Sequence, residues 1–121
     1  MSNEKANIIQ QKSFKFALTS IDLYIKLKSE KEYVISKQLL RSATSIGANV
    51  EEAIAASSKR DFAHKIGLSL KEVRETYYWL RLLDQSKLTN IETAKIRAES
   101  LELIKILSAI LKTTRLNHLD S

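Results

Sequence analysis

Hydrophobic positions along the 121-residue chain recur at intervals of three and four residues, in four blocks separated by short polar breaks. This spacing is the period of an α-helix that buries one face, so it predicts four amphipathic helices. We expect them at residues 7–28, 34–56, 59–86 and 90–117 of a single domain that spans residues 1–121. Because the connections are short, consecutive helices must run antiparallel, which predicts an all-α, up-down-up-down four-helix bundle.

Each block carries one main hydrophobic stripe, which we expect to face the core. In chain order the stripes are Phe14, Ala17, Leu18, Ile21 and Ile25; Ile35, Leu39, Ala43, Ile46, Val50 and Ala53 with Ile54; Phe62, Ile66, Leu70, Val73, Tyr77 and Leu80; and Ala94, Ala98, Leu101, Ile104, Leu107 and Leu111. Ser58 with Asp61 predicts a capping pair at the start of the third helix, and Thr89 with Glu92 a capping box at the start of the fourth. Residues 117–121 are expected to form a loose tail.

The first and fourth blocks carry more hydrophobic residues than one bundle interior can use. The first block has a second set off its main stripe, namely Phe16, Leu23, Tyr24 and Leu27. The fourth block is apolar on nearly all sides from Leu101 to Leu111. A helix of a bundle buries a face about 100° wide, so a second apolar face needs a second partner. We therefore predict a homo-oligomer.

Composition narrows the classes of protein further. The chain has no cysteine, which excludes a disulfide framework, a thiolate zinc site, an iron–sulfur cluster and a cysteine nucleophile. It has no proline and two glycines, which argues against the many tight turns of a β-sandwich or barrel. No stretch reaches the roughly 18 consecutive apolar residues of a membrane span, and the N-terminus lacks the apolar region of a signal peptide. We expect a cytoplasmic protein without a membrane partner.

The second block has an unusual run of small and polar residues. A glycine inside a helix costs about 1 kcal/mol relative to alanine, so its presence indicates the close approach of another backbone. The small residues are Ala43, Gly47 and Ala48. Arg41 lies on a polar stripe of the same block, and we expect it to pair with Glu72 or Glu75 in a network that fixes helix register.

Catalytic and metal-binding patterns are missing. Di-metal bundles need Glu-x-x-His motifs, and the only partial match is Asp61 with His64, where Asp61 is already explained as a cap. A Ser-His-Asp arrangement is not supported by two histidines, of which His118 lies in the expected tail. No glycine-rich phosphate loop is present. We predict that the protein is not an enzyme and has neither a metal site nor a cofactor.

Four segments of the chain carry a family resemblance. They are QLLRSATSIGANVEEA at residues 38–53, SKRDF at 58–62, LKEVRET at 70–76 and YWL at 78–80. Over about residues 12–112 the sequence resembles the small four-helix bundle proteins encoded in intervening sequences of bacterial 23S ribosomal RNA genes. The resemblance implies an antiparallel bundle that assembles as a ring-like homopentamer. A related branch is the accessory variability protein of diversity-generating retroelements, a basic pentamer that binds nucleic acid and works with a reverse transcriptase.

The charge balance suggests a polyanionic partner. Twenty Lys and Arg face fourteen Asp and Glu, which gives a net charge of +6 and a pI near 9.6. The third block places Arg60, His64, Lys71, Arg74, Tyr78 and Arg81 on one stripe, and the first block adds Lys12, Lys15 and Lys26. Such rows can follow the phosphates of RNA or DNA, and Tyr78 can stack on a base. Nothing resembles a groove-reading motif, so binding would be largely independent of sequence.

Two alternatives stay open. Each basic residue can instead pair with a carboxylate at helical spacing, as Lys71 can with Glu75. A second functional hypothesis is an oligomeric scaffold whose partner is a protein, such as a reverse transcriptase or another nucleic-acid enzyme. It rests on the spare hydrophobic surface and on the absence of catalytic patterns.

Overall fold

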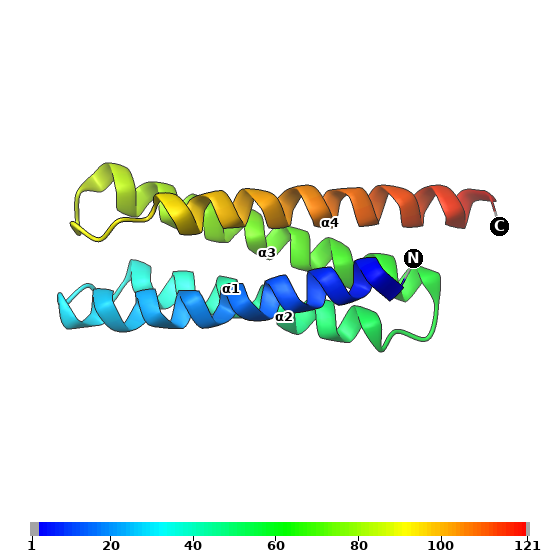
Figure 1. Ribbon diagram of the computed structural model, residues 1–121, viewed down its shortest axis with the longest axis horizontal. Helices are drawn as coiled ribbons and strands as arrows, with labels where there is room; N and C mark the ends of the chain where they lie inside the picture. The colour runs from blue at the N-terminus through cyan, green and yellow to red at the C-terminus, as the bar shows by residue number, and fades with distance from the viewer. Residues whose placement is uncertain (1–2, 121) are drawn as a thin grey trace.

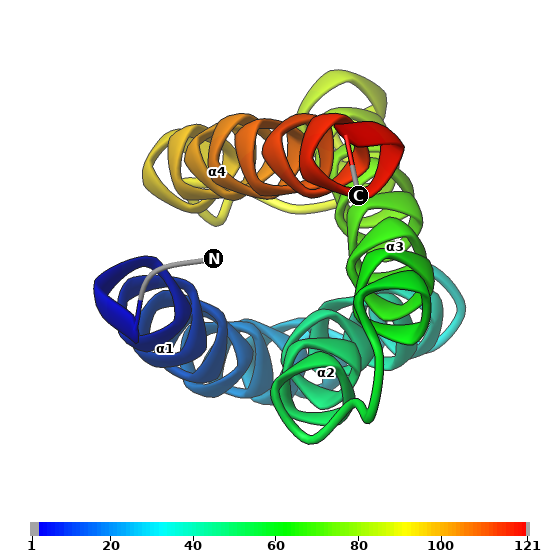
Figure 2. The same cartoon turned by 90° about the vertical axis from the view of Figure 1, so that its right-hand side faces the viewer.

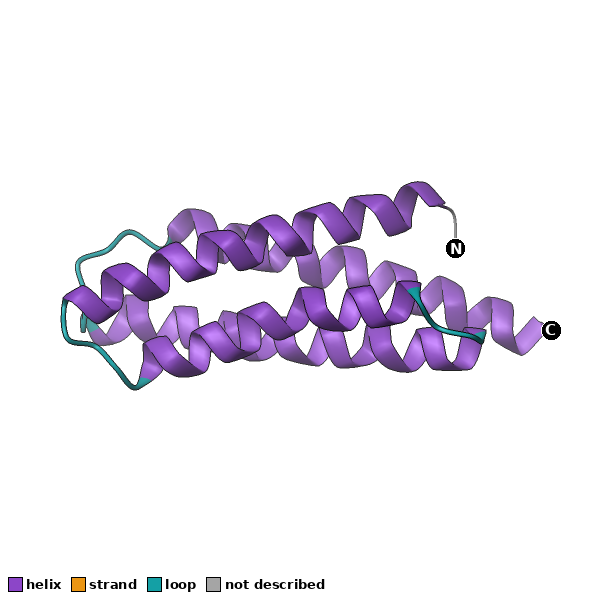
Figure 3. Cartoon of the chain, turned by 90° about the horizontal axis from the view of Figure 1, so that it is seen from below, coloured by secondary structure: helices purple, strands orange, loops and turns teal. Residues whose placement is uncertain are grey.

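The computed structural model describes residues 3–120, with side chains described for Glu4 and for residues 6–117. Over this range it contains four α-helices and no strand (Figure 3). The helices are α1 (Asn3–Ser29), α2 (Ile35–Ile54), α3 (Lys59–Ser86) and α4 (Ala94–Asp120). The prediction of an all-α fold with four helices is confirmed.

Consecutive helices pack side by side. α1 contacts α2, α2 contacts α3 and α3 contacts α4, while the contact between α1 and α4 is the sparsest of the four. Figure 1 shows the chain turning back after α1, α2 and α3. Viewed along the long axis, the helices follow one another in chain order around the bundle (Figure 2). The helix α4 therefore has two flanks, one shared with α3 and the other with α1.

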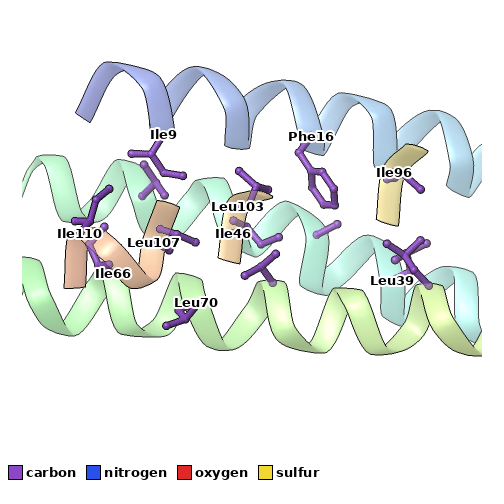
Figure 4. Close-up of a cluster of buried hydrophobic side chains, with 14 of the residues drawn as sticks. Ile9, Phe16, Leu39, Ile46, Ile66, Leu70, Ile96, Leu103, Leu107 and Ile110 are labelled. Atoms are coloured by element: carbon purple, nitrogen blue, oxygen red, sulfur yellow. The ribbon is translucent and has the colours of Figure 1, made fainter. Parts of the chain in front are cut away.

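The core draws hydrophobic side chains from all four helices, and Figure 4 shows ten of them labelled. Their apolar area, removed from water, supplies the main favourable term in folding. The largest fully buried side chains are Phe16, Ile9, Leu27, Leu39, Ile46, Ile66, Leu80, Leu83, Leu103, Leu107, Ile110 and Val50. The stripes predicted for the second and third helices supply much of this set, as expected.

The stripe predicted for the first helix is wrong, because α1 presents it to solvent. Phe14, Leu18, Ile21 and Ile25 are 63%, 50%, 38% and 58% exposed. The buried face is the opposite one, formed by Ile9, Ser13, Phe16, Ser20, Leu23 and Leu27. The helix does carry two hydrophobic faces, as predicted. The face expected in the core is exposed, and the second face is the one that is buried.

A close approach between α1 and α2 explains why the more polar face is buried. A Cβ atom added at Gly47 would lie 3.4 Å from the carbonyl oxygen of Ser13, so the two backbones come close at this point, as the glycine predicted. A small side chain such as Ser13 fits such a seam, whereas a larger one would force the helices apart. The hydroxyl of Ser13 donates to the carbonyl of Gln10, and that of Ser20 to the carbonyl of Phe16. Both serines are thus buried with their polar atoms satisfied.

Side chains cap the starts of α2 and α3. The Ser58 hydroxyl accepts a hydrogen bond from the Asp61 N–H at 3.0 Å, which confirms Ser58 as the predicted cap of α3. Glu32, which the sequence did not single out, accepts from the N–H groups of Ile35 and Ser36 at the start of α2. Burial raises the pKa of Glu32, but the backbone donors outweigh it and leave that pKa below its ordinary value.

The predicted start of the fourth helix is wrong. α4 begins at Ala94 rather than near residue 90. The Thr89 hydroxyl donates to Glu30 and accepts from the N–H of Ile91, and Glu92 accepts from the N–H of Ala94. These residues therefore fold the connection between α3 and α4 instead of forming a capping box.

The end of α4 and its hydrophobic stripe also differ from expectation. The helix continues through Asp120, so residues 117–120 are helical rather than a loose tail, and Ser121 lies outside the described residues. Ala94, Ala98 and Leu101 face solvent. Leu107 and Leu111 of the predicted stripe are buried as expected, and the other core positions of α4 are Ile96, Leu103 and Ile110. A helix that is hydrophobic nearly all round leaves its buried side undecided until its neighbours are known.

Candidate nucleic-acid interface

The basic stripe predicted on the third helix lies on the surface of α3. It consists of Arg60, Lys71, Arg74, Tyr78 and Arg81, together with His64, and all six side chains are exposed. Their spacings of three, four and seven residues keep them on one side of the helix. Asp84, further toward the end of α3, lies 3.7 Å from a guanidinium nitrogen of Arg97 on α4. The structure therefore brings the predicted α3 residues together on one basic face.

The carboxylates of the central part of α3 point toward α2. Nη1 of Arg41 lies 3.3 Å from Oε2 of Glu72, and Nη2 of the same guanidinium donates to Glu75. Trp79 donates from Nε1 to Glu75 at 3.0 Å. Burial raises the pKa of Glu75, but the hydrogen bonds from Trp79 and Arg41 outweigh it and lower that pKa. The expected ion-pair network is confirmed, and it draws both carboxylates toward Arg41 on α2, although the charge of Lys71 also helps to lower the Glu75 pKa.

Aromatic rings accompany the cations. Tyr78 is half-exposed, and its ring meets that of Trp79 edge to face with the centroids 5.3 Å apart. The guanidinium of Arg81 lies 5.9 Å from the centroid of the Tyr77 ring, within cation–π range. Tyr78 thus offers part of one ring at a position between Arg74 and Arg81, held in orientation by its neighbour.

A groove between α3 and α4 extends this basic face. It measures about 330 Å³, and its polar rim carries the cations Arg74, Lys112 and Arg115. The remaining lining residues are Leu70, Ser108, Leu111 and Leu116, so no carboxylate lines it. We name it the α3/α4 groove. Sequence reasoning missed Lys112 and Arg115. The available signal was their spacing of three residues in a stretch of α4 that has no acidic residue between Glu102 and Asn117.

The lysines predicted on the first helix lie elsewhere, on the flank between α1 and α4. Nζ of Lys12 forms an ion pair with Glu102 at 2.6 Å. A groove of about 260 Å³, the α1/α4 groove, contains Lys15 and Lys26. Its other charged lining residues are Asp22, Glu92, Lys95 and Glu99. The structure does not bring Lys12, Lys15 and Lys26 onto the basic face of α3, and it surrounds them with carboxylates.

The described part of the chain holds neither a metal-binding cluster nor a membrane span. Within it, no three side chains of His, Cys, Asp or Glu gather closely enough to hold a metal ion. His64, half of the weak sequence match, is exposed on α3, and the side chain of His118 lies outside the described residues. Among the described residues no helix combines the length and the hydropathy needed to cross a bilayer.

Comparisons with known proteins identify the family of the chain. Comparison with curated proteins finds no match. A crystal structure from Bacteroides thetaiotaomicron, described as a protein with unknown function from the S23 ribosomal protein family, superposes with a TM-score of 0.84. Its sequence is 44% identical, over 89% of this chain and 98% of that chain. A sequence model of the 23S rRNA-intervening sequence protein family matches residues 5–109. The protein described here therefore belongs to the 23S rRNA-intervening sequence protein family.

Proposed function

We propose that this protein is a non-catalytic, cytoplasmic oligomer that binds nucleic acid without sequence specificity through the basic face of α3. The observation that carries the proposal is the separation of charge on that helix. Among the described residues, the four cations of the basic face form no ion pair, whereas Glu72 and Glu75 are engaged by Arg41 on the side facing α2. Lys71 is the one cation of this face whose charge acts on Glu75 and helps to lower the pKa of that carboxyl. Cations that are not held in an ion pair are free to replace the counterions of a phosphate backbone.

Binding of this kind has a defined signature. Each phosphate that a Lys or Arg neutralises releases condensed counterions, so affinity falls as salt rises. Phosphate contacts position a protein without reading sequence, which agrees with a sequence in which we find no groove-reading motif. Several copies of the face in one oligomer would add avidity without new contacts.

A salt titration tests the proposal. Binding of the full chain to labelled RNA and DNA, single-stranded and duplex, is measured between about 50 and about 200 mM salt. The expected result is binding at the lowest salt that weakens steeply along the series and changes little with sequence. Absence of binding to every probe at the lowest salt contradicts the proposal.

The exposed face of α1 supports the oligomer. Phe14, Leu18, Ile21 and Ile25 follow one another at spacings of four, three and four residues, which is the seam of a coiled coil. All four are exposed in the single chain and lie opposite the core. A continuous hydrophobic seam of this kind marks an interface. We propose that it packs against another copy of the chain. The family resemblance suggests five copies.

Two variants separate the seam from other exposed hydrophobic positions. The double change Leu18→Glu with Ile25→Glu places charges in the seam, and we expect it to lower the mass of the particle in solution. Leu88→Glu, at an exposed leucine of the connection between α3 and α4, is the control and should leave the mass unchanged. Light scattering at matched concentrations gives the answer. A monomeric wild-type protein, or equal masses for all three proteins, contradicts the proposed interface.

A second candidate function uses the same seam differently. The exposed hydrophobic face of α1 would equally suit a helix of a protein partner, such as a reverse transcriptase or another nucleic-acid enzyme. The two candidates separate in a pull-down from the native host. Stoichiometric recovery of one protein after nuclease treatment favours the scaffold, whereas loss of every partner to nuclease favours nucleic-acid binding.

A further inference from the structure

The α3/α4 groove differs in kind from the rest of the basic face. The exposed stripe of α3 offers charge alone over most of its length. The groove combines three cations on its rim with the leucines Leu70, Leu111 and Leu116 below and beside them. Leu70 and Leu111 are buried and form its floor, while Leu116 is half-exposed at its edge.

This combination selects among phosphate-bearing ligands. A row of cations accepts any phosphate, on a duplex or on a single strand. A hydrophobic floor adds affinity only for a ligand that brings an apolar face between its phosphates. In a duplex the faces of the bases are stacked inside the helix, whereas in a single strand they are free to lie on a protein surface.

We propose that the α3/α4 groove holds a nucleotide of single-stranded RNA or DNA. The base lies on the leucine floor, and the neighbouring phosphates contact Arg74, Lys112 and Arg115. This inference rests on the proposed nucleic-acid binding and names its substrate class and its path. A volume of about 330 Å³ falls in the lower part of the range usual for sites that bind small ligands.

The position of Tyr78 continues the path beyond the groove. It follows Arg74 by four residues, one turn further along the exposed side of α3. Its half-exposed ring is held against Trp79. A strand leaving the groove along α3 would meet this ring with its next bases, and every base has a face that can stack on it.

The flank between α1 and α4 provides a matched control for the α3/α4 groove. The triple change R74Q, K112Q and R115Q removes three cations from the proposed path. The triple change K12Q, K15Q and K26Q removes three from the other flank. Each lowers the net charge from +6 to +3, so any difference between the two variants reports position rather than total charge.

The experiment compares these two variants with the wild-type chain on single-stranded RNA, single-stranded DNA and a DNA duplex of the same sequence. Each phosphate that a cation neutralises on a single strand adds about 0.7 to the slope of log affinity against log salt. We expect the slope to become shallower by about 2 in the groove variant. In the control variant it should stay as in the wild type. The wild-type chain should prefer either single strand to the duplex.

One further variant tests the hydrophobic floor separately. Leu116→Ser removes an exposed leucine, so the core is untouched. We expect single-strand affinity to fall about threefold, the effect of removing about 25 Å² of apolar contact. The salt slope should not change, because no charge is altered.

The different failures are distinguishable. If no nucleic acid binds the wild-type chain, the proposed function itself fails. If nucleic acid binds but the duplex binds as well as the single strands, or if both triple variants show equally shallow slopes, the groove is not the path and this inference is overturned. If one single strand binds and neither the other strand nor the duplex does, the bound strand is identified, and the groove is supported when only the groove variant shows the shallower slope on that strand.

Discussion

The two flanks of α4 carry grooves with the same number of cations but with different numbers of carboxylates. The α3/α4 groove and the α1/α4 groove are of similar size, about 330 and about 260 Å³, and each has three cations among its lining residues. In the second groove three carboxylates accompany them, and a further ion pair between Lys12 and Glu102 lies on the same flank. In the first groove no lining residue is acidic.

The difference is one of pairing rather than of the number of cations. A lysine beside a carboxylate has its field largely cancelled at short range, and screening by salt removes the rest beyond about 10 Å. A cation without such a neighbour keeps its attraction for a phosphate. Net charge therefore identifies a candidate protein, and the placement of the acids identifies the face. On α3 that placement depends on Arg41, which holds Glu72 and Glu75 on the side facing α2.

Reversing charge in the α3/α4 groove should have the largest effect. We expect Arg74→Glu with Arg115→Glu to weaken single-strand binding about 100-fold or more at low salt, since two charge-assisted hydrogen bonds of about 1.5 kcal/mol each are removed. The matched change on the other flank is Lys15→Glu with Lys26→Glu, for which we expect a much smaller effect. Fluorescence anisotropy with a labelled oligonucleotide measures both. Equal weakening in the two variants would erase the distinction between the flanks.

Removing the ring of Tyr78 should have the next largest effect. A base that stacks on an aromatic ring contributes about 1–3 kcal/mol, so Tyr78→Ala should weaken single-strand binding about fivefold or more. Duplex binding should change little because its bases are not available for stacking. Tyr33→Ala, at an exposed tyrosine outside α3, is the control. A reduction that is the same for duplex and single strand argues against stacking.

The balanced flank can be converted into a basic one. Lys12 and Lys15 share a small cavity with Glu99 and Glu102. Glu99→Gln with Glu102→Gln frees both lysines, and we expect the salt slope of single-strand binding to steepen by about 1.4, the contribution of two further phosphate contacts. Glu4→Gln with Glu52→Gln makes the same change in net charge at exposed carboxylates away from the cavity. If the control variant steepens as much, total charge rather than pairing governs binding.

Acid should produce the smallest effect, through Glu75. Its pKa is lowered in the folded chain, so its contribution to stability is complete above the unfolded value of about 4.3 and is lost as pH falls through the folded value. The ion pair with Arg41 is partly exposed, so we expect Glu75→Gln to cost only about 0.2–1 kcal/mol at neutral pH. The difference in unfolding free energy between variant and wild type should vanish in acid. A difference that persists below the folded pKa would assign the effect to packing instead.

Sequence reasoning succeeded where a helix has only one hydrophobic face. On α2 and α3 the predicted positions Leu39, Ile46, Val73 and Leu80 are buried as expected, and Ile54, at the end of α2, is the exception at 42% exposed. On α1 two faces compete, and the more hydrophobic one, from Phe14 to Ile25, faces solvent. The buried face contains Ser13 because α2 approaches closely at Gly47. Hydropathy counts serine as polar and takes no account of how near the neighbouring backbone lies.

The candidate site could be predicted only in part. The basic stripe of α3 is local, because helical periodicity alone brings Arg74 and Arg81 to one side. The α3/α4 groove is not local, since Arg74 meets Lys112 and Arg115 only when α3 and α4 pack together. The ion pair between Lys12 and Glu102 joins α1 to α4, so local sequence does not predict it either.

Photo-cross-linking tests the central claim most directly. A single-stranded oligonucleotide that carries one photoreactive base is bound to the wild-type chain, irradiated and mapped by mass spectrometry. We predict cross-links in α3 around Tyr78 and in α4 around Leu111 and Leu116, at the α3/α4 groove. Cross-links concentrated instead between Lys12 and Lys26 of α1 would contradict this claim.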